Sequence, residues 1–132
     1  MAKFYKKACD LAPNEGFASF ACYNTGVTYD YGKDGFKQSR KEAARYYKLA
    51  CDNEKEPNYI SCYNLGLLYY DGEGVRQDMA ETKYLYSLAC DNDIKEACYN
   101  LGIAFEQERN LLKAKEYKQK ACKLGISQAC NL

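Results

Sequence analysis

Residues 62–75 read CYNLGLLYYDGEGV and decide the fold. A cysteine, an apolar residue, a glycine and an aromatic residue stand at relative positions 0, +3, +4 and +7, which is the spacing of one stripe along an α-helix. Related stretches are CYNTG at 22–26, CYNLG at 98–102 and CNL at 130–132. The pattern therefore predicts a repeated helix, here named the opening helix, that begins near a cysteine and twice ends in a glycine-rich loop.

A second group of cysteines follows an alanine near the end of a segment. The four tetrapeptides are KKAC at Cys9, KLAC at Cys51, SLAC at Cys90 and QKAC at Cys122. The helix that ends at each is named the closing helix. Opening cysteines at 22, 62, 98 and 130 are 40, 36 and 32 residues apart. Such periods are typical of solenoids, in which one two-helix unit cannot bury its apolar face alone.

The predicted fold is therefore all-α, an α/α solenoid or superhelix of antiparallel helix-hairpin repeats. A chain of 132 residues is expected to form a single domain. We divide it into a half unit at 1–17, repeats at about 18–57, 58–93 and 94–125, and a half unit at 126–132.

Glycines have two predicted roles in this pattern. A glycine inside a helix costs up to about 1 kcal/mol relative to alanine. Three at one register, Gly26, Gly66 and Gly102, therefore predict a neighbouring helix that passes too close for a Cβ atom. Gly32, Gly35, Gly72 and Gly74 supply the left-handed conformations of two tight loops. The third loop, EQERN, lacks them and predicts a tighter or frayed corner.

Ser39, Asp78 and Asn110 each lie twelve residues before a closing cysteine and are good N-caps. Ser39 with Glu42 fits a capping box, and the Asp78 pair is a close analogue. The closing helices are expected to begin there. Their predicted core stripe is Phe4, Tyr46, Leu85 and Tyr117, followed four residues later by Ala8, Ala50, Ala89 and Ala121.

Composition restricts the partners and the compartment. Nineteen basic and eighteen acidic side chains leave a net charge of +1, so no overall field favours nucleic acid or anionic lipid. No apolar run is long enough to span a membrane, and the N-terminus lacks the apolar region of a signal peptide. Eight cysteines without histidine favour disulfides in an oxidising compartment. We expect a secreted or periplasmic bacterial protein.

The spacing of the cysteines predicts how they pair. Successive closing and opening cysteines are 13, 11, 8 and 8 residues apart. A continuous helix holds even an i, i+8 pair about 12 Å apart, beyond the reach of a disulfide, so the helix must break between them. Because the pattern repeats, each unit can then form the same local bridge. The predicted disulfides are therefore Cys9–Cys22, Cys51–Cys62, Cys90–Cys98 and Cys122–Cys130. No metal site or cofactor is expected, because tetrahedral metal sites gather their ligands in CxxC or histidine motifs.

The pattern ACYNLGxxY, then DGEGV, then a helix ending in YxLAC resembles the Sel1-like repeat family of tetratricopeptide-like solenoids. It is most similar to the cysteine-rich Sel1-like proteins of Helicobacter, in which cysteines bridge neighbouring helices. The resemblance implies an adaptor whose opening helices line a concave face. It also implies an alternative, because cysteine-rich Helicobacter members are described as binding penicillin and hydrolysing β-lactams slowly.

Candidate ligand-binding residues for this concave face follow the opening cysteines. Tyr23, Tyr63 and Tyr99 stand one residue after them, and Asn24, Asn64 and Asn100 stand two after. The asparagine position lies about 200° around the helix from the cysteine and is expected to be exposed. Amides and amphipathic rings suit an extended peptide or a polysaccharide. A second interpretation also stands, in which the asparagines are inherited with the repeat and hydrogen-bond to the backbone of a neighbouring helix.

Catalysis has little support in the sequence. A serine β-lactamase needs lysine three residues after its nucleophile, and no serine in the chain has one. A metal-dependent hydrolase needs histidine, which is absent. We therefore expect no catalytic residues and a protein or peptide partner. A penicillin-binding protein with weak β-lactam hydrolase activity is the alternative, with a β-lactam or a cell-wall fragment as its ligand.

Overall fold

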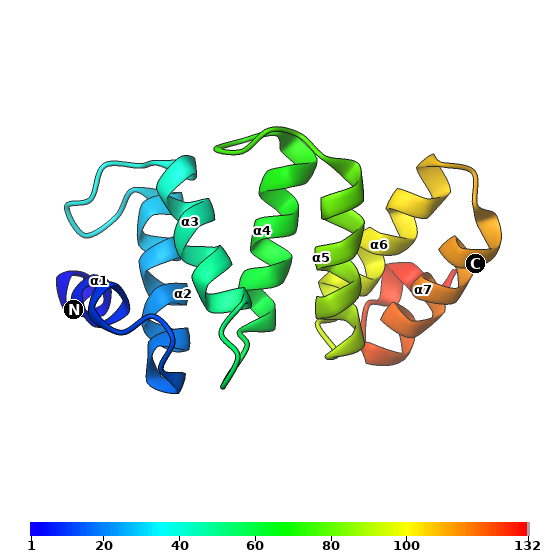
Figure 1. The fold of residues 1–132 in the computed structure, drawn as a ribbon. Helices are drawn as coiled ribbons and strands as arrows, with labels where there is room; N and C mark the ends of the chain where they lie inside the picture. The colour runs from blue at the N-terminus through cyan, green and yellow to red at the C-terminus, as the bar shows by residue number, and fades with distance from the viewer. Residues whose placement is uncertain (132) are drawn as a thin grey trace.

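The computed structural model describes residues 1–131, which form seven α-helices and one short 3₁₀ turn without any β-strand. The opening helices are α2 (Gly16–Tyr31), α4 (Tyr59–Asp71) and α6 (Lys95–Gln107). The closing helices are α1 (Ala2–Leu11), α3 (Arg40–Cys51), α5 (Met79–Asp91) and α7 (Leu111–Leu124), and the turn η1 (Ser127–Cys130) follows them. The helices succeed one another along an elongated molecule (Figure 1). The predicted all-α solenoid is confirmed.

The helical glycines leave room for side chains of the closing helices. A methyl group on Gly26 would lie 2.5 Å from Cδ1 of Tyr47, and one on Gly66 would lie 2.8 Å from the Tyr86 ring. Both rings are almost completely buried. The interpretation of these glycines as packing contacts is confirmed.

Aromatic pairs join opening and closing helices in the first and third repeats. Tyr29 stacks on Tyr46 with 5.8 Å between ring centroids, and Phe105 stacks on Tyr117 at 5.6 Å. The first half unit differs, because the Phe4 side chain is 65% exposed. Its assignment to the core stripe was therefore wrong: α1 packs on α2 through Tyr5, Ala8 and Cys9, and Phe4 lies outside that contact.

Ser39, Asp78 and Asn110 cap α3, α5 and α7 as predicted. Each side chain accepts a hydrogen bond from the backbone N–H three residues later, at 3.0–3.2 Å. A capping box has two reciprocal hydrogen bonds, and only the one accepted by the Ser39 or Asp78 side chain is present among the described residues. The N–H groups of Ser39 and Asp78 donate to the carbonyls of Tyr29 and Tyr69 on the preceding opening helices, at 2.9 and 3.1 Å. The caps thus also join the two helices of a repeat.

The third corner is tighter than the first two. Helix α6 ends at Gln107 and α7 begins at Leu111, with Arg109 in the left-handed region at φ 63°. The Asn110 N–H donates to the Phe105 carbonyl at 2.9 Å, so the shortened loop keeps the bond made in the other repeats.

Four disulfides join each closing helix to the segment that follows it. They link Cys9 to Cys22, Cys51 to Cys62, Cys90 to Cys98 and Cys122 to Cys130, with Cα atoms 4.7–5.0 Å apart. The cysteines of the first three pairs are buried, whereas Cys130 in the last is exposed. The structure therefore has the sequential pairing that the spacings predict.

Candidate functional site

Four residues of each opening helix lie on one side of that helix, at positions −2, +2, +5 and +9 from its cysteine, because helical residues three or four apart are neighbours. Each of them is either exposed or half-buried. We name these twelve residues the opening-helix face. They are Phe20, Asn24, Val27 and Tyr31 on α2, Ile60, Asn64, Leu67 and Asp71 on α4, and Glu96, Asn100, Ile103 and Gln107 on α6.

Two hydrogen bonds place α4 and α6 side by side in register. Asn100 Nδ2 donates to the Tyr63 hydroxyl at 3.0 Å, and Gln107 Nε2 donates to the Tyr70 hydroxyl at 3.1 Å. Donors and acceptors are each seven residues apart, so the contact repeats after two helical turns. Equivalent positions of these helices therefore form rows across the face.

The three asparagines occupy equivalent positions of α2, α4 and α6 but differ in their hydrogen bonds. Each is half-buried, so the expectation that these asparagines are exposed was wrong. Asn24 Nδ2 donates to the Phe20 carbonyl of its own helix at 3.0 Å, and Asn100 bonds to Tyr63. The described residues contain no hydrogen bond of the Asn64 side chain. Asn100 therefore makes a contact between helices, as in the second interpretation, but with a side-chain hydroxyl and not with the backbone.

The tyrosines beside them lie in the seams between helices. The Tyr63 ring lies 5.6 Å from that of Tyr86, and Tyr23 and Tyr99 pack against the central core cluster. Burial raises the pKa of Tyr63, and the nearby Glu96 carboxylate raises it further. All three tyrosines are half-buried.

Apolar side chains flank the asparagine row. Val27, Leu67 and Ile103 form the half-buried row at +5. Phe20 and Ile60, at −2, remain 56% and 45% exposed, and Tyr31 at +9 is 70% exposed. Contiguous exposed apolar surface on a folded domain is typical of an interaction site. The apolar part of the face is concentrated on α2 and α4.

No lysine or arginine occurs among the twelve residues of the face. Its charged members are Asp71 and Glu96, and neither forms an ion pair with any described residue. Two other acids of the opening helices are neutralised. Asp30 pairs with Arg40 at 2.7 Å, and Glu106 pairs with Lys118 at 2.8 Å.

The closing helices have the opposite charge. Helices α1, α3, α5 and α7 carry thirteen lysines and arginines against five acidic residues, whereas α2, α4 and α6 carry only Lys95 against four acids. A chain with a net charge of +1 therefore separates its charge between its two sets of helices. The net charge of the whole chain does not reveal this separation.

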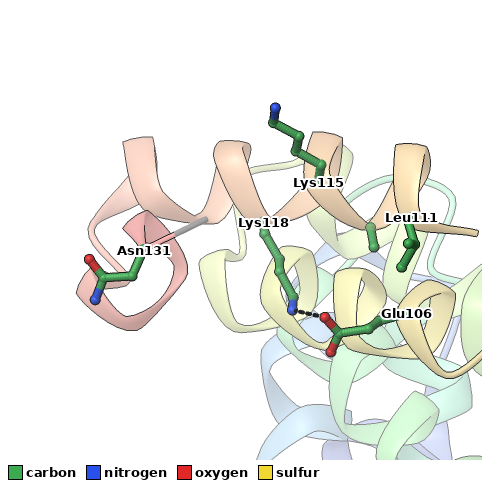
Figure 2. Close-up of a pocket in the computed structure, with 6 residues that line it drawn as sticks. Glu106, Leu111, Lys115, Lys118 and Asn131 are labelled. Atoms are coloured by element: carbon green, nitrogen blue, oxygen red, sulfur yellow. Dashed lines mark hydrogen bonds and ion pairs between the residues drawn. The ribbon is translucent and has the colours of Figure 1, made fainter. Parts of the chain in front are cut away.

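A pocket of about 320 Å³ lies beside α7 (Figure 2). Lys118 points across it to Glu106, while Lys115 points away, and Asn131 closes the far end. Lys118 stands where Tyr47 and Tyr86 stand in the first two repeats, because its Cγ is the atom that a methyl group on Gly102 would meet, at 2.8 Å. Its ion pair thus replaces the phenol contact of an earlier repeat.

The sequence reading missed three of the four rows of the face. The signal was present, since positions −2, +5 and +9 recur at the same register as the asparagines. Their exposure depends on how adjacent repeats cover one another, which one helix wheel does not show.

No group of three or more potential metal ligands occurs among residues 1–131, and none of the described helices is both long and apolar enough to cross a bilayer.

Comparison with known families finds the Sel1 repeat, whose model matches residues 19–54, 60–94 and 95–126. Two curated relatives are named cytochrome c oxidase assembly factor 7. The Homo sapiens protein is 38% identical over 72 residues, which are 54% of this chain and 29% of the relative. The Xenopus tropicalis protein is 30% identical over 136 residues, which cover 98% and 57%. The chain thus spans well under two thirds of their length.

Three solved structures share the fold. A protective antigen of uropathogenic Escherichia coli strains superposes with a TM-score of 0.85 at 26% identity, over 98% of this chain and 27% of that one. A Sel1 repeat protein from Oxalobacter formigenes gives 0.76 at 25% identity, over 97% and 92%. Cysteine rich protein B of Helicobacter pylori gives 0.66 at 26% identity, over 97% and 88%.

Proposed function

The chain belongs to the Sel1 repeat family, and on this premise we propose that it is an exported scaffold that binds a protein or peptide on its opening-helix face. The fold offers a row of equivalent helices instead of a deep cavity, which suits an extended partner. In this proposal the face is the concave side of the solenoid, lined by α2, α4 and α6.

The observation that carries the proposal is the composition of the face. The face combines half-buried aliphatic side chains with exposed Phe20 and Ile60 and with the Asn64 amide, which has no hydrogen-bond partner among the described residues. Phe20 also contacts the Tyr5 ring, yet more than half of its surface stays accessible. Apolar surface contributes to affinity when a partner removes it from water. Amide groups can bond the main chain of an extended peptide.

The disulfides support the exported part of the proposal. Four bridges use all eight cysteines, an arrangement that persists in oxidising compartments and is rare where thiols are kept reduced. Relatives named as assembly factors support a role in contacts between proteins over a catalytic role.

Site-specific photo-crosslinking tests the proposal. A photoreactive amino acid replaces Asn64 on the face, and a matched control replaces exposed Gln119 on closing helix α7. Both proteins are expressed in the source cells, irradiated and analysed by mass spectrometry. The expected result is one or a few proteins crosslinked through position 64 and absent at position 119. Crosslinks confined to position 119, or identical at both positions, would contradict the assignment of the face.

A further inference from the structure

The two unpaired carboxylates of the opening-helix face constrain the partner's chemistry. Asp71 ends α4 and Glu96 lies in the first turn of α6, and both are exposed. Because neither has a cation among residues 1–131, their negative potential acts on whatever occupies the face. Asp30 and Glu106, with ion pairs of their own, add little to it.

Apolar and acidic positions are separated along the face. In the row at −2, Phe20 on α2 and Ile60 on α4 are followed by Glu96 on α6. In the row at +9, Tyr31 on α2 is followed by Asp71 and Gln107. The α2 end is therefore aromatic and aliphatic, whereas negative charge is confined to α4 and α6.

The absence of basic residues from the face argues against an acidic peptide segment as the partner. An acidic segment would bring carboxylates against Asp71 and Glu96 without any lysine or arginine to receive them, and like charges oppose association. Such a segment fits the closing helices, where thirteen basic side chains lie.

Given the proposed binding function of this face, we infer that its partner is a peptide segment with lysine or arginine close to an apolar anchor. The anchor covers Phe20 and Ile60, and the basic side chains lie near Glu96 and Asp71. The peptide main chain runs across the asparagine row, where Asn64 supplies a free amide. This arrangement places the apolar part of the partner toward α2 and its basic part toward α6.

Selection from a random library tests the inference without knowledge of the natural partner. Phage displaying random twelve-residue peptides are panned on the oxidised wild-type protein. Panning is repeated on the double variant Asp71→Lys/Glu96→Lys and on the control Glu54→Lys/Glu116→Lys. The control makes the same charge change at exposed acids outside the face that lack ion pairs. Circular dichroism verifies that all three proteins are equally helical.

The inference predicts that wild-type and control proteins enrich lysine or arginine together with aliphatic or aromatic residues. The face variant loses the basic enrichment, and a synthetic peptide selected on the wild type binds it about tenfold more weakly. Selected peptides without excess basic residues, or equal loss in the control, would overturn the inference.

Asn64→Arg separates this failure from failure of the proposed function. Peptides that lose binding to Asn64→Arg yet lack basic residues would leave the opening-helix face as the binding site and refute only the charge argument. Peptides whose affinity is unaffected by Asn64→Arg would place binding elsewhere and refute both.

Discussion

At the scale of single residues, a glycine within an opening helix sets how closely two helices can pack. The Gly66→Ala variant adds a methyl group 2.8 Å from two carbons of the Tyr86 ring and 3.4 Å from Leu85 Cβ, and both neighbours are buried. Overpacking costs about 1–3 kcal/mol and outweighs the gain in helix propensity of up to about 1 kcal/mol. We expect the free energy of unfolding, from urea denaturation of the oxidised protein, to fall.

Gly16→Ala is the matched control for this variant. Gly16 begins α2, and a Cβ there meets only ordinary contacts of 3.6–3.7 Å. Its stability should stay the same or rise by up to about 1 kcal/mol. A Gly66→Ala protein as stable as Gly16→Ala would show that the helices do not pack at this glycine.

A buried tyrosine makes stability depend on alkaline pH. Burial raises the pKa of Tyr47 far above its ordinary value, and the neighbouring Asp30 carboxylate, which accepts a hydrogen bond from the Tyr47 hydroxyl at 2.8 Å, raises it further. Below about pH 10 the phenol is protonated in both the folded and the unfolded chain. At higher pH only the unfolded chain releases this proton, so stability falls by about 1.4 kcal/mol per pH unit for this residue.

The Tyr47→Phe variant measures that contribution, because it keeps the ring against Gly26 and removes the titrating hydroxyl. Its free energy of unfolding should fall less steeply than that of the wild type between about pH 9 and pH 11. Equal slopes for the two proteins would mean that the Tyr47 phenol ionises as readily folded as unfolded.

At the scale of elements, the disulfides differ in their access to solvent. Cys130 is exposed on the short turn η1, while Cys9, Cys22, Cys62, Cys90 and Cys98 have no exposed surface. A reductant reaches a buried bond only after local opening. Limited reduction followed by alkylation and peptide mapping should therefore label Cys122 and Cys130 first. Equal labelling of Cys51 and Cys62 at the earliest times would contradict the packing of the second repeat.

The elements themselves were largely predictable because their signals are local and repeated. Ser39, Asp78 and Asn110 marked helix starts, and the cysteine spacings required a break between bridged helices. Contacts between repeats were not predictable in this way. Asn100 meets Tyr63 from 37 residues away, so no helix wheel shows that the amide is already bonded.

The candidate site was predicted only in part for the same reason. The sequence placed Asn64 on an accessible side of its helix, where the structure has it. It did not show that Tyr63 lies in a seam, that Phe4 is exposed, or that Lys118 replaces a core tyrosine. Each of these depends on a neighbouring helix and not on the local pattern.

At the scale of the whole molecule, the sequence predicts no catalytic residues, so we expect the protein not to hydrolyse a β-lactam. The chain has no histidine and no serine with lysine three residues later. Nitrocefin hydrolysis by the oxidised protein, purified from a host without β-lactamase genes, should equal the buffer rate. Turnover proportional to protein concentration, and abolished by alkaline unfolding of the same sample, would favour the β-lactam hydrolase alternative.

The central claim is that the face formed by α2, α4 and α6 binds the partner. The most direct measurement is the dissociation constant of the crosslinked partner for wild-type, Asn64→Arg and Gln119→Arg proteins. Arginine at position 64 places a large charged side chain in the middle of the face, and position 119 receives the same change on α7. The account predicts at least about a tenfold loss of affinity for Asn64→Arg and no change for Gln119→Arg. Equal affinities of all three proteins would contradict it.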